Sequence, residues 1–277
     1  MKFYAVTSYK PSAVTDALRC ELVPHASNLV LSKGNHLEIY GFSKEEGMDV
    51  EDGDQDDENK CSLSLVEDVP LNGRIVSVQS FRPKDAEQDR LFILTEHKHF
   101  CVLGYNAQDK KVVTFACGDL SSAIGRVPDA GFKCVKDPQN RMIGMVLYEG
   151  HMKLLPMQAN GGFQAAFDDR ILEITRLVDL CFLDGHSKPT LCILYEDDTE
   201  ARHLKTFVVE SRDKELIAGP WKQSNVDNSA HTLMPVEGGG VVVLGETTIS
   251  YYGGSNNNNT VQAVSMTPAI ITSYSLV

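Results

Sequence analysis

Histidines at or beside short polar turns are the residues of this sequence whose type and spacing could do chemistry. They fall at four places: His36, the His97 and His99 pair, His151 and His203. Two histidines two residues apart on a strand would point to the same side and could share a metal ion. The sequence indicates no third ligand for such a site. We therefore interpret these histidines as polar residues of exposed turns and predict no metal centre.

The sequence signatures of several enzyme classes are absent. It has no phosphate-binding GxxxxGK[ST] loop and no GxSxG nucleophile elbow, and Gly238–Gly240 precedes a strand-like run rather than a helix. The alternating aspartates of Asp52–Asp56 are spaced like the start of a calcium loop. However, Asp57 occupies the position of the turn glycine, and Leu63 that of the bidentate glutamate. We interpret this run as a solvated acidic loop and predict no catalytic or cofactor-binding residue, hence no enzyme.

Five hairpin-like repeats must position these turns. In each, a short apolar run crosses a few polar residues and returns as a more mixed run. From the second copy onward the starts lie 51, 49 and 50 residues apart. A period of about 40–50 residues built from hairpins is typical of propeller blades. The copies are Leu29–Tyr40, Leu91–Tyr105, Met142–Met157, Leu191–Val209 and Val241–Tyr252.

Weaker strand-like runs lie between the hairpins, at Arg74–Phe81, Lys111–Cys117 and Ala130–Val135. Each repeat therefore has room for about four strands, the number a blade needs. The run Asp168–Leu183 has apolar residues at helical spacing. It occupies the place of the first, innermost strand of a blade, so we assign it to β structure.

These patterns predict an all-β fold, a β-propeller of four-stranded blades. Five blades are visible, whereas propellers of such blades commonly have about seven, so we expect an incomplete ring that is the N-terminal piece of a longer chain. We treat residues 1–277 as one partial propeller. It carries an acidic loop insert at 43–60 and a polar loop at 253–260.

The charge of the chain argues against general binding to nucleic acid. The formal net charge is −12, of which the insert 43–60 supplies −7, and a nucleic-acid surface needs basic residues. The seven cysteines show no CxxC spacing, and no apolar stretch is long enough to cross a membrane. We expect a nuclear protein, also found in the cytoplasm, without a disulfide framework.

The hairpin turns are a candidate partner surface. If each hairpin is the same strand pair of its blade, the five turns emerge on one face. We interpret Trp221 as an anchor that covers a loop rather than as a partner contact. The residues predicted to bind partners are Asn35, His36, His97, Lys98, His151, Arg202 and His203.

Short motifs recur in order over nearly the whole chain. They are Lys10–Val14, Leu37–Tyr40, Phe81–Lys84, Leu91–Thr95, Ile124–Arg126, Arg141–Gly144, Leu147–Tyr148, His203–Phe207 and Gly219–Gln223. These motifs resemble the N-terminal region of the large subunit of the UV-damaged-DNA-binding protein. The large subunits of splicing factor 3b and of the cleavage–polyadenylation specificity complex share this architecture.

The resemblance implies a non-enzymatic scaffold in DNA repair and protein ubiquitination. Members of the family carry three propellers. The middle one docks the cullin-4 scaffold of a ubiquitin ligase, and the other two hold substrate receptors. This chain would contribute the first propeller and reach cullin-4 only through the absent middle one. The alternatives are the equivalent propeller of a splicing or polyadenylation subunit and, from another class, a propeller hydrolase. We expect no cofactor and no sequence-specific nucleic acid.

Overall fold

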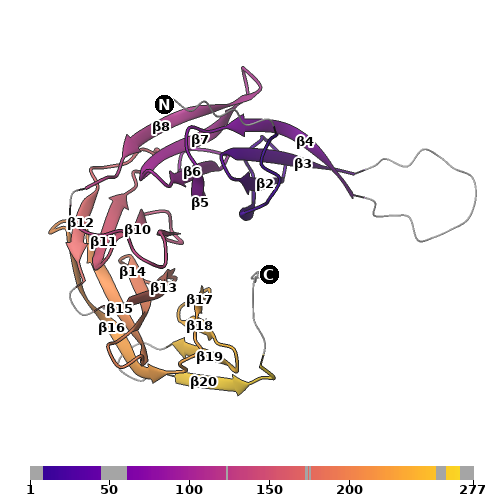
Figure 1. Cartoon of the computed structure of the whole chain (residues 1–277). Helices are drawn as coiled ribbons and strands as arrows, with labels where there is room; N and C mark the ends of the chain where they lie inside the picture. The colour runs from indigo at the N-terminus through magenta and orange to yellow at the C-terminus, as the bar shows by residue number, and fades with distance from the viewer. Residues whose placement is uncertain are drawn as a thin grey trace, which may run out of the picture. The chain divides into compact units, whose positions relative to one another are not determined.

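The computed structural model describes residues 9–44, 61–122, 124–171, 174, 176–253 and 260–268. Within these ranges the regular structure consists of strands (Figure 1). No helix in this part of the chain is long and apolar enough to span a membrane. The chain divides into two compact units. The first comprises Met1–Ser121 with Ala159–Gly161, and the second comprises Ser122–Gln158 with Gly162–Val277.

The first unit contains two four-stranded antiparallel sheets, each with its strands side by side in chain order. One consists of β1 (Asp16–Cys20), β2 (Asn28–Lys33), β3 (His36–Lys44) and β4 (Cys61–Pro70). The other consists of β5 (Ile75–Phe81), β6 (Arg90–Thr95), β7 (His99–Asn106) and β8 (Lys111–Asp119).

The second unit contains three sheets of the same design. The first has β9 (Lys133–Lys136), β10 (Met142–Tyr148), β11 (His151–Pro156) and β12 (Phe167–Arg170). The next has β13 (Arg176–Leu183), β14 (Thr190–Glu196), β15 (Arg202–Glu210) and β16 (Glu215–Val226). The last has β17 (Thr232–Pro235), β18 (Val241–Leu244), β19 (Thr248–Gly253) and β20 (Thr260–Ser265).

The apolar runs of the sequence are the second strands of these sheets. Every residue of β10 is buried, and β6 and β14 are nearly as enclosed. A strand covered on both faces has no solvent side, so its sequence is uniformly apolar instead of alternating. The fourth strand β8, by contrast, is mostly exposed or half-buried. The predicted all-β class with four-stranded blades is confirmed, and five such sheets lie in the described residues.

The hydrophobic cores lie between neighbouring sheets of the same unit. In the first unit, Leu37 and Ile39 of β3 belong to one buried cluster with Leu91 and Ile93 of β6. The second unit has two such clusters, one on each side of the sheet β13–β16. Each fully buried aliphatic side chain contributes about 1.5–3 kcal/mol of hydrophobic stabilisation.

Carboxylates on the first strands add polar links between neighbouring sheets. Oδ2 of Asp179 on β13 accepts a hydrogen bond from the Leu233 amide of β17 at 2.9 Å, and Oδ1 lies 3.2 Å from Lys133 Nζ of β9. In the first unit, Asp16 of β1 accepts one from the backbone of Val78 on β5. The same connection thus recurs in both units, between one first strand and the next.

Two strand assignments need refinement. The β assignment of Asp168–Leu183 is confirmed for the two strands that the structure places in this run, but the run is not one strand. β12 ends at Arg170 and closes one sheet, and β13 begins the next sheet at Arg176. The run predicted at Ala130–Val135 begins later, at Lys133, because Pro128–Gly131 form a turn. The acidic residues 45–60, with the candidate calcium-loop aspartates, and residues 254–259 of the polar loop lie outside the described residues.

Candidate interaction surface

The predicted partner residues lie at turns between the second and third strands of four sheets, and the fifth sheet has an equivalent turn between β18 and β19. Four of these five turns share a backbone tie, in which the amide of an apolar residue leaving the fourth strand donates to a turn carbonyl. The donor–acceptor pairs are Leu71 to Asn35, Leu120 to Lys98, Ile171 to Gly150 and Met266 to Thr247, at 2.8–2.9 Å. These hydrogen bonds hold the turns through main-chain atoms and therefore do not involve the side chains of the turn residues.

In the first unit, one turn presents Asn35 and His36. Asn35 is exposed. His36 Nδ1 lies 2.9 Å from Asp68 Oδ1 on β4, and Lys10 also binds this carboxylate. These two hydrogen bonds, that of Lys10 first, hold the pKa of Asp68 below its usual value. His36 is therefore part of a local charge cluster as well as a surface residue.

The other turn of the first unit presents His97 and Lys98. The His97 side chain is 68% exposed, with Nε2 3.7 Å from Glu96 Oε1. Lys98 has a positive φ of 62° at the turn. His99 begins β7 and faces a different carboxylate, Asp119, at 3.9 Å. No group of three potential metal ligands comes together among the residues that the structure describes.

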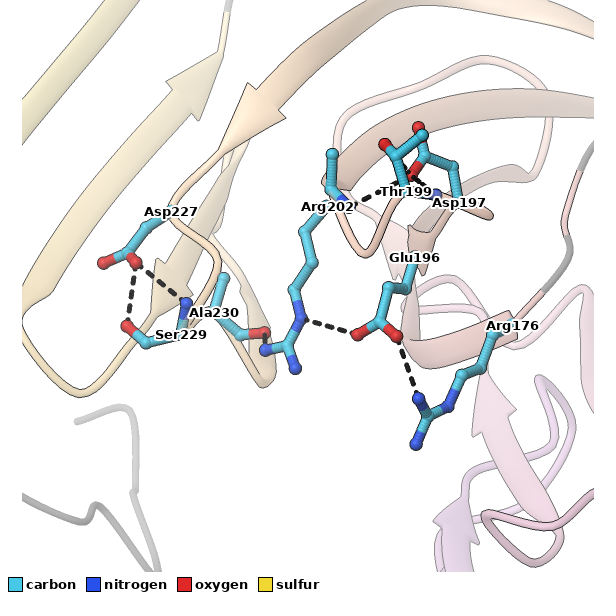
Figure 2. A network of polar contacts seen from close by, with 9 residues as sticks. Arg176, Glu196, Asp197, Thr199, Arg202, Asp227, Ser229 and Ala230 are labelled. Atoms are coloured by element: carbon cyan, nitrogen blue, oxygen red, sulfur yellow. Dashed lines mark hydrogen bonds and ion pairs between the residues drawn. The ribbon is translucent and has the colours of Figure 1, made fainter.

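In the second unit, Arg202 lies in a polar network that joins two sheets (Figure 2). Its Nε is 3.4 Å from Glu196 Oε2, and its NH1 donates to the carbonyl of Ala230 in the loop before β17. The other carboxylate oxygen, Glu196 Oε1, accepts from Arg176 NH1 at 2.8 Å. Arg202 is 21% exposed, whereas Arg176 is 74% exposed, so Arg176 is the cation that this network presents to solvent.

His203 is part of the same hairpin. Its Nε2 lies 2.9 Å from Asp197 Oδ2, and its Nδ1 accepts the Asn225 amide at 3.3 Å. Because Nδ1 accepts, Nε2 carries the proton and donates to Asp197. This bond is the main cause of the lowered pKa of Asp197, to which Thr199 also contributes. The ring also packs on Tyr195 at 5.3 Å. The geometry therefore gives Arg202 and His203 structural contacts, and their predicted partner role stays a prediction.

A pocket of about 360 Å³ opens beside Arg176 in the second unit. Its lining combines the turn between β10 and β11, the loop before β9 and the residues entering β13. Val146 and Ile174 supply buried apolar surface, and Glu149 and Arg176 supply charge. The full lining is Pro128, Asp129, Ala130, Gly131, Val146, Glu149, Gly150, Ile174, Arg176 and Leu177.

One rim of this pocket is held by Arg126. Its guanidinium lies 3.1 Å from both Glu149 Oε2 and Asp129 Oδ2. His151 sits next to this rim, with Nδ1 2.9 Å from the Glu149 carbonyl. An apolar floor with a rim of both charges can receive an apolar side chain of a partner and orient its polar neighbours.

Sequence reasoning identified the turn that carries His151, which borders this pocket, and missed the rest of the lining. Pro128 and Gly131 are typical turn residues, so the turn that they form could have been predicted from the sequence. Nothing in the sequence says that Ile174, from the segment between β12 and β13, completes the floor. Trp221 has a structural role but does not cover a loop: it lies on β16, and its side chain is buried in one of the two hydrophobic clusters of the second unit.

Comparison with known proteins agrees with the motif resemblance. A family model described as the RSE1/DDB1/CPSF1 first β-propeller matches residues 12–276. DNA damage-binding protein 1b of Arabidopsis thaliana is 38% identical over 234 residues, which are 84% of this chain and 20% of that protein. DNA damage-binding protein 1 of Solanum cheesmaniae is 39% identical over 234 residues, with the same coverage.

The corresponding protein of Oryza sativa subsp. japonica is 38% identical over 242 residues, 86% of this chain and 21% of that protein. This chain thus spans about a fifth of the length of these relatives. Together with the five four-stranded sheets, the match over nearly the whole chain places it among the propellers: this chain belongs to the RSE1/DDB1/CPSF1 first β-propeller family.

Proposed function

We propose that this chain is a non-enzymatic protein-interaction scaffold, part of the first propeller of a cullin-4 ubiquitin-ligase adaptor. In this role it helps to hold substrate receptors in DNA repair and protein ubiquitination, in the nucleus and also in the cytoplasm. The observation that carries the proposal is the first-propeller match, supported by relatives that bear the name DNA damage-binding protein 1. Cullin-4 would be reached through another propeller of the full-length protein.

The pocket beside Arg176 is the proposed contact of this unit with a partner. Its apolar floor favours a leucine- or phenylalanine-sized side chain, and Glu149 and Arg176 favour polar groups of either charge beside it. The net charge of −12 favours protein partners over nucleic acid.

The main alternative is the equivalent propeller of a splicing or polyadenylation subunit, since the family description covers such proteins. Affinity purification of the tagged full-length protein from its own cells, followed by mass spectrometry, separates the two. We expect cullin-4 and substrate receptors. Recovery of spliceosomal or polyadenylation subunits without cullin would refute the ligase role. A propeller hydrolase is the least favoured function, because no motif of a hydrolase was found in the sequence.

The pocket is tested by Ala130→Arg, which places a long cation at its exposed mouth. We expect receptor recovery to fall at least about fivefold, because loss of one well-seated contact costs about 1–3 kcal/mol. Ala107→Arg is the matched control, because Ala107 is also exposed, in the turn between β7 and β8. Equal recovery with both variants would exclude the pocket but leave the scaffold role standing.

A further inference from the structure

Two cysteines face each other across β7 and β8. The register pairs Cys101 with Cys117, and the shift in this ladder lies beyond them, after Val102. The amide of Leu120 donates to the carbonyl of Lys98 at 2.9 Å, three positions further along the same register. Hydrogen-bonded and non-hydrogen-bonded pairs alternate in an antiparallel ladder, so the cysteines are a non-hydrogen-bonded pair.

This type of pair brings the two thiols within reach of each other. Its Cα atoms are about 4.5 Å apart, which lies inside the span of about 4.4–6.8 Å found in disulfides. Cys101 and Cys117 are both free thiols in the structure. A disulfide between them therefore needs side-chain rotation rather than a change of register.

The two thiols differ in their access to solvent. Cys117 is exposed on the outer strand β8, and Cys101 is half-buried on β7. Burial, with a smaller contribution from the neighbouring Cys117, raises the pKa of Cys101 to about 11. Cys117 is thus the thiol that an oxidant in solution meets first, and Cys101 is placed to resolve the product.

A second opposed pair provides an internal comparison. Cys181 and Cys192 face each other across β13 and β14, and both are buried. Their mutual hydrogen bond and burial hold the pKa of Cys181 well above its usual value. An oxidant in solution has no access to this pair in the folded state, so it should stay reduced.

We propose that Cys101 and Cys117 are an oxidation site, at which hydrogen peroxide converts the pair into a reversible disulfide. The Cys117 thiolate attacks a peroxide oxygen, the O–O bond breaks, and Cys117 becomes a sulfenic acid. The hydroxide that leaves takes up the proton lost by the Cys117 thiol and becomes water. The Cys101 sulfur then attacks the Cys117 sulfur and gives up its proton. The S–S bond forms as the S–O bond breaks, releasing a second water. Two thiols are oxidised as one peroxide is reduced to two waters.

The disulfide would close the hairpin that turns between Asn106 and Lys111. It would fix the outer strand β8 to β7, so the amides of β8 should exchange hydrogen more slowly in the oxidised chain. A dithiol reductant restores the original state, because it exchanges with an accessible disulfide.

The test is thiol mapping of the 277-residue chain after graded hydrogen peroxide, alkylation of remaining thiols and trypsin digestion without reduction. Cys101 and Cys117 fall in different tryptic peptides, 99–110 and 112–126, because Lys110 and Lys111 separate them. We expect these two peptides to become linked. Cys181 and Cys192 share the peptide 177–202, because Pro189 blocks cleavage after Lys188. We expect both of its cysteines to be alkylated.

Variants make the assignment specific. Cys117→Ser should abolish the linked peptides and leave Cys101 alkylated, whereas Cys101→Ser should leave Cys117 oxidised without a link. Cys134→Ser, in the other unit, should keep the link. The proposal is wrong if Cys117 proceeds to a sulfinic acid while Cys101 stays alkylated, if Cys117 links only to another chain, or if the 177–202 peptide is oxidised first.

Discussion

Replacing Arg141 should destabilise the second unit strongly, because its guanidinium neutralises a carboxylate with no access to water. The Asp137 side chain is 0% exposed. Arg141 Nε and NH2 each donate to it at 2.8 Å, and NH1 donates to the carbonyls of His186 and Ser187 at 2.9 Å. The side chain thus ties the turn between β9 and β10 to the loop between β13 and β14.

The expected cost of Arg141→Met is about 3–5 kcal/mol, the range observed when one partner of a buried ion pair is removed. Most of this cost comes from the charge left at Asp137. Adding Asp137→Asn to the variant should therefore recover at least about 1 kcal/mol, although it is a second substitution in the same core. Arg141→Lys should cost less, about 1–3 kcal/mol, because an ammonium keeps the charge but cannot form the fork.

The assay is urea unfolding at neutral pH, followed by circular dichroism and fluorescence, with the free energy of unfolding compared at constant m-value. Arg212→Met is the control. Arg212 is an exposed arginine in the turn between β15 and β16, and its replacement should change stability by less than about 0.5 kcal/mol. Two results would refute the reasoning. One is a loss of unfolding free energy below about 1 kcal/mol for Arg141→Met. The other is a loss in the double variant that equals the sum of the losses from its two substitutions.

Two further predictions concern the fourth sheet. Gly219→Ala should destabilise by about 1–3 kcal/mol in the same urea assay, because the new methyl group would lie 2.5 Å from the backbone carbon of Thr206. Gly125→Ala, whose methyl group meets ordinary contacts from 3.6 Å, should be near neutral. Asp197→Asn should lower stability at neutral pH, since the pKa of Asp197 is depressed in the folded state, chiefly by His203. The difference in the free energy of unfolding between the variant and the parent should disappear as the pH falls below about 4 and on through the folded-state pKa of Asp197. A difference that persists in acid would contradict this assignment.

The polar network in Figure 2 changes how the candidate surface should be tested. A charge reversal at Arg202 would break its contacts with Glu196 and Ala230, so a loss of binding could reflect damage to the fold. Lys98 and Arg176 are better positions, because one lies at a turn tip and the other is largely exposed. Variants at these two residues probe each unit separately.

The strands of this protein were predictable because buried strands appear in the sequence as runs of consecutive apolar residues. Leu91–Leu94 and Val241–Leu244 are uniformly apolar, and seven of these eight residues are buried. The division of Asp168–Leu183 was not visible, because apolar residues at helical spacing look alike whether they belong to one element or to the ends of two. The repeat period supplied the correct β assignment but not the break.

For the candidate residues, the sequence predicted their places at the turns but not the residues that they contact. The turns bearing His36, His151 and His203 follow from the hairpin pattern, which sets where the chain reverses. Their partners do not follow, since Asp68 lies 32 residues from His36 and Asn225 lies 22 residues from His203. Such pairings depend on strand register, which a single bulge can shift.

The sequence by itself determined the all-β class, the five repeats and the equivalence of the turns, because alternation and burial act between near neighbours in the chain. Only the tertiary structure decided that Ile174 completes the pocket beside Arg176, and that Asp137 is buried with its charge against Arg141. It also placed Cys101 opposite Cys117. These arrangements bring together segments that are separate in the sequence. Their geometry is set by register and by packing between strands, which local sequence patterns do not specify.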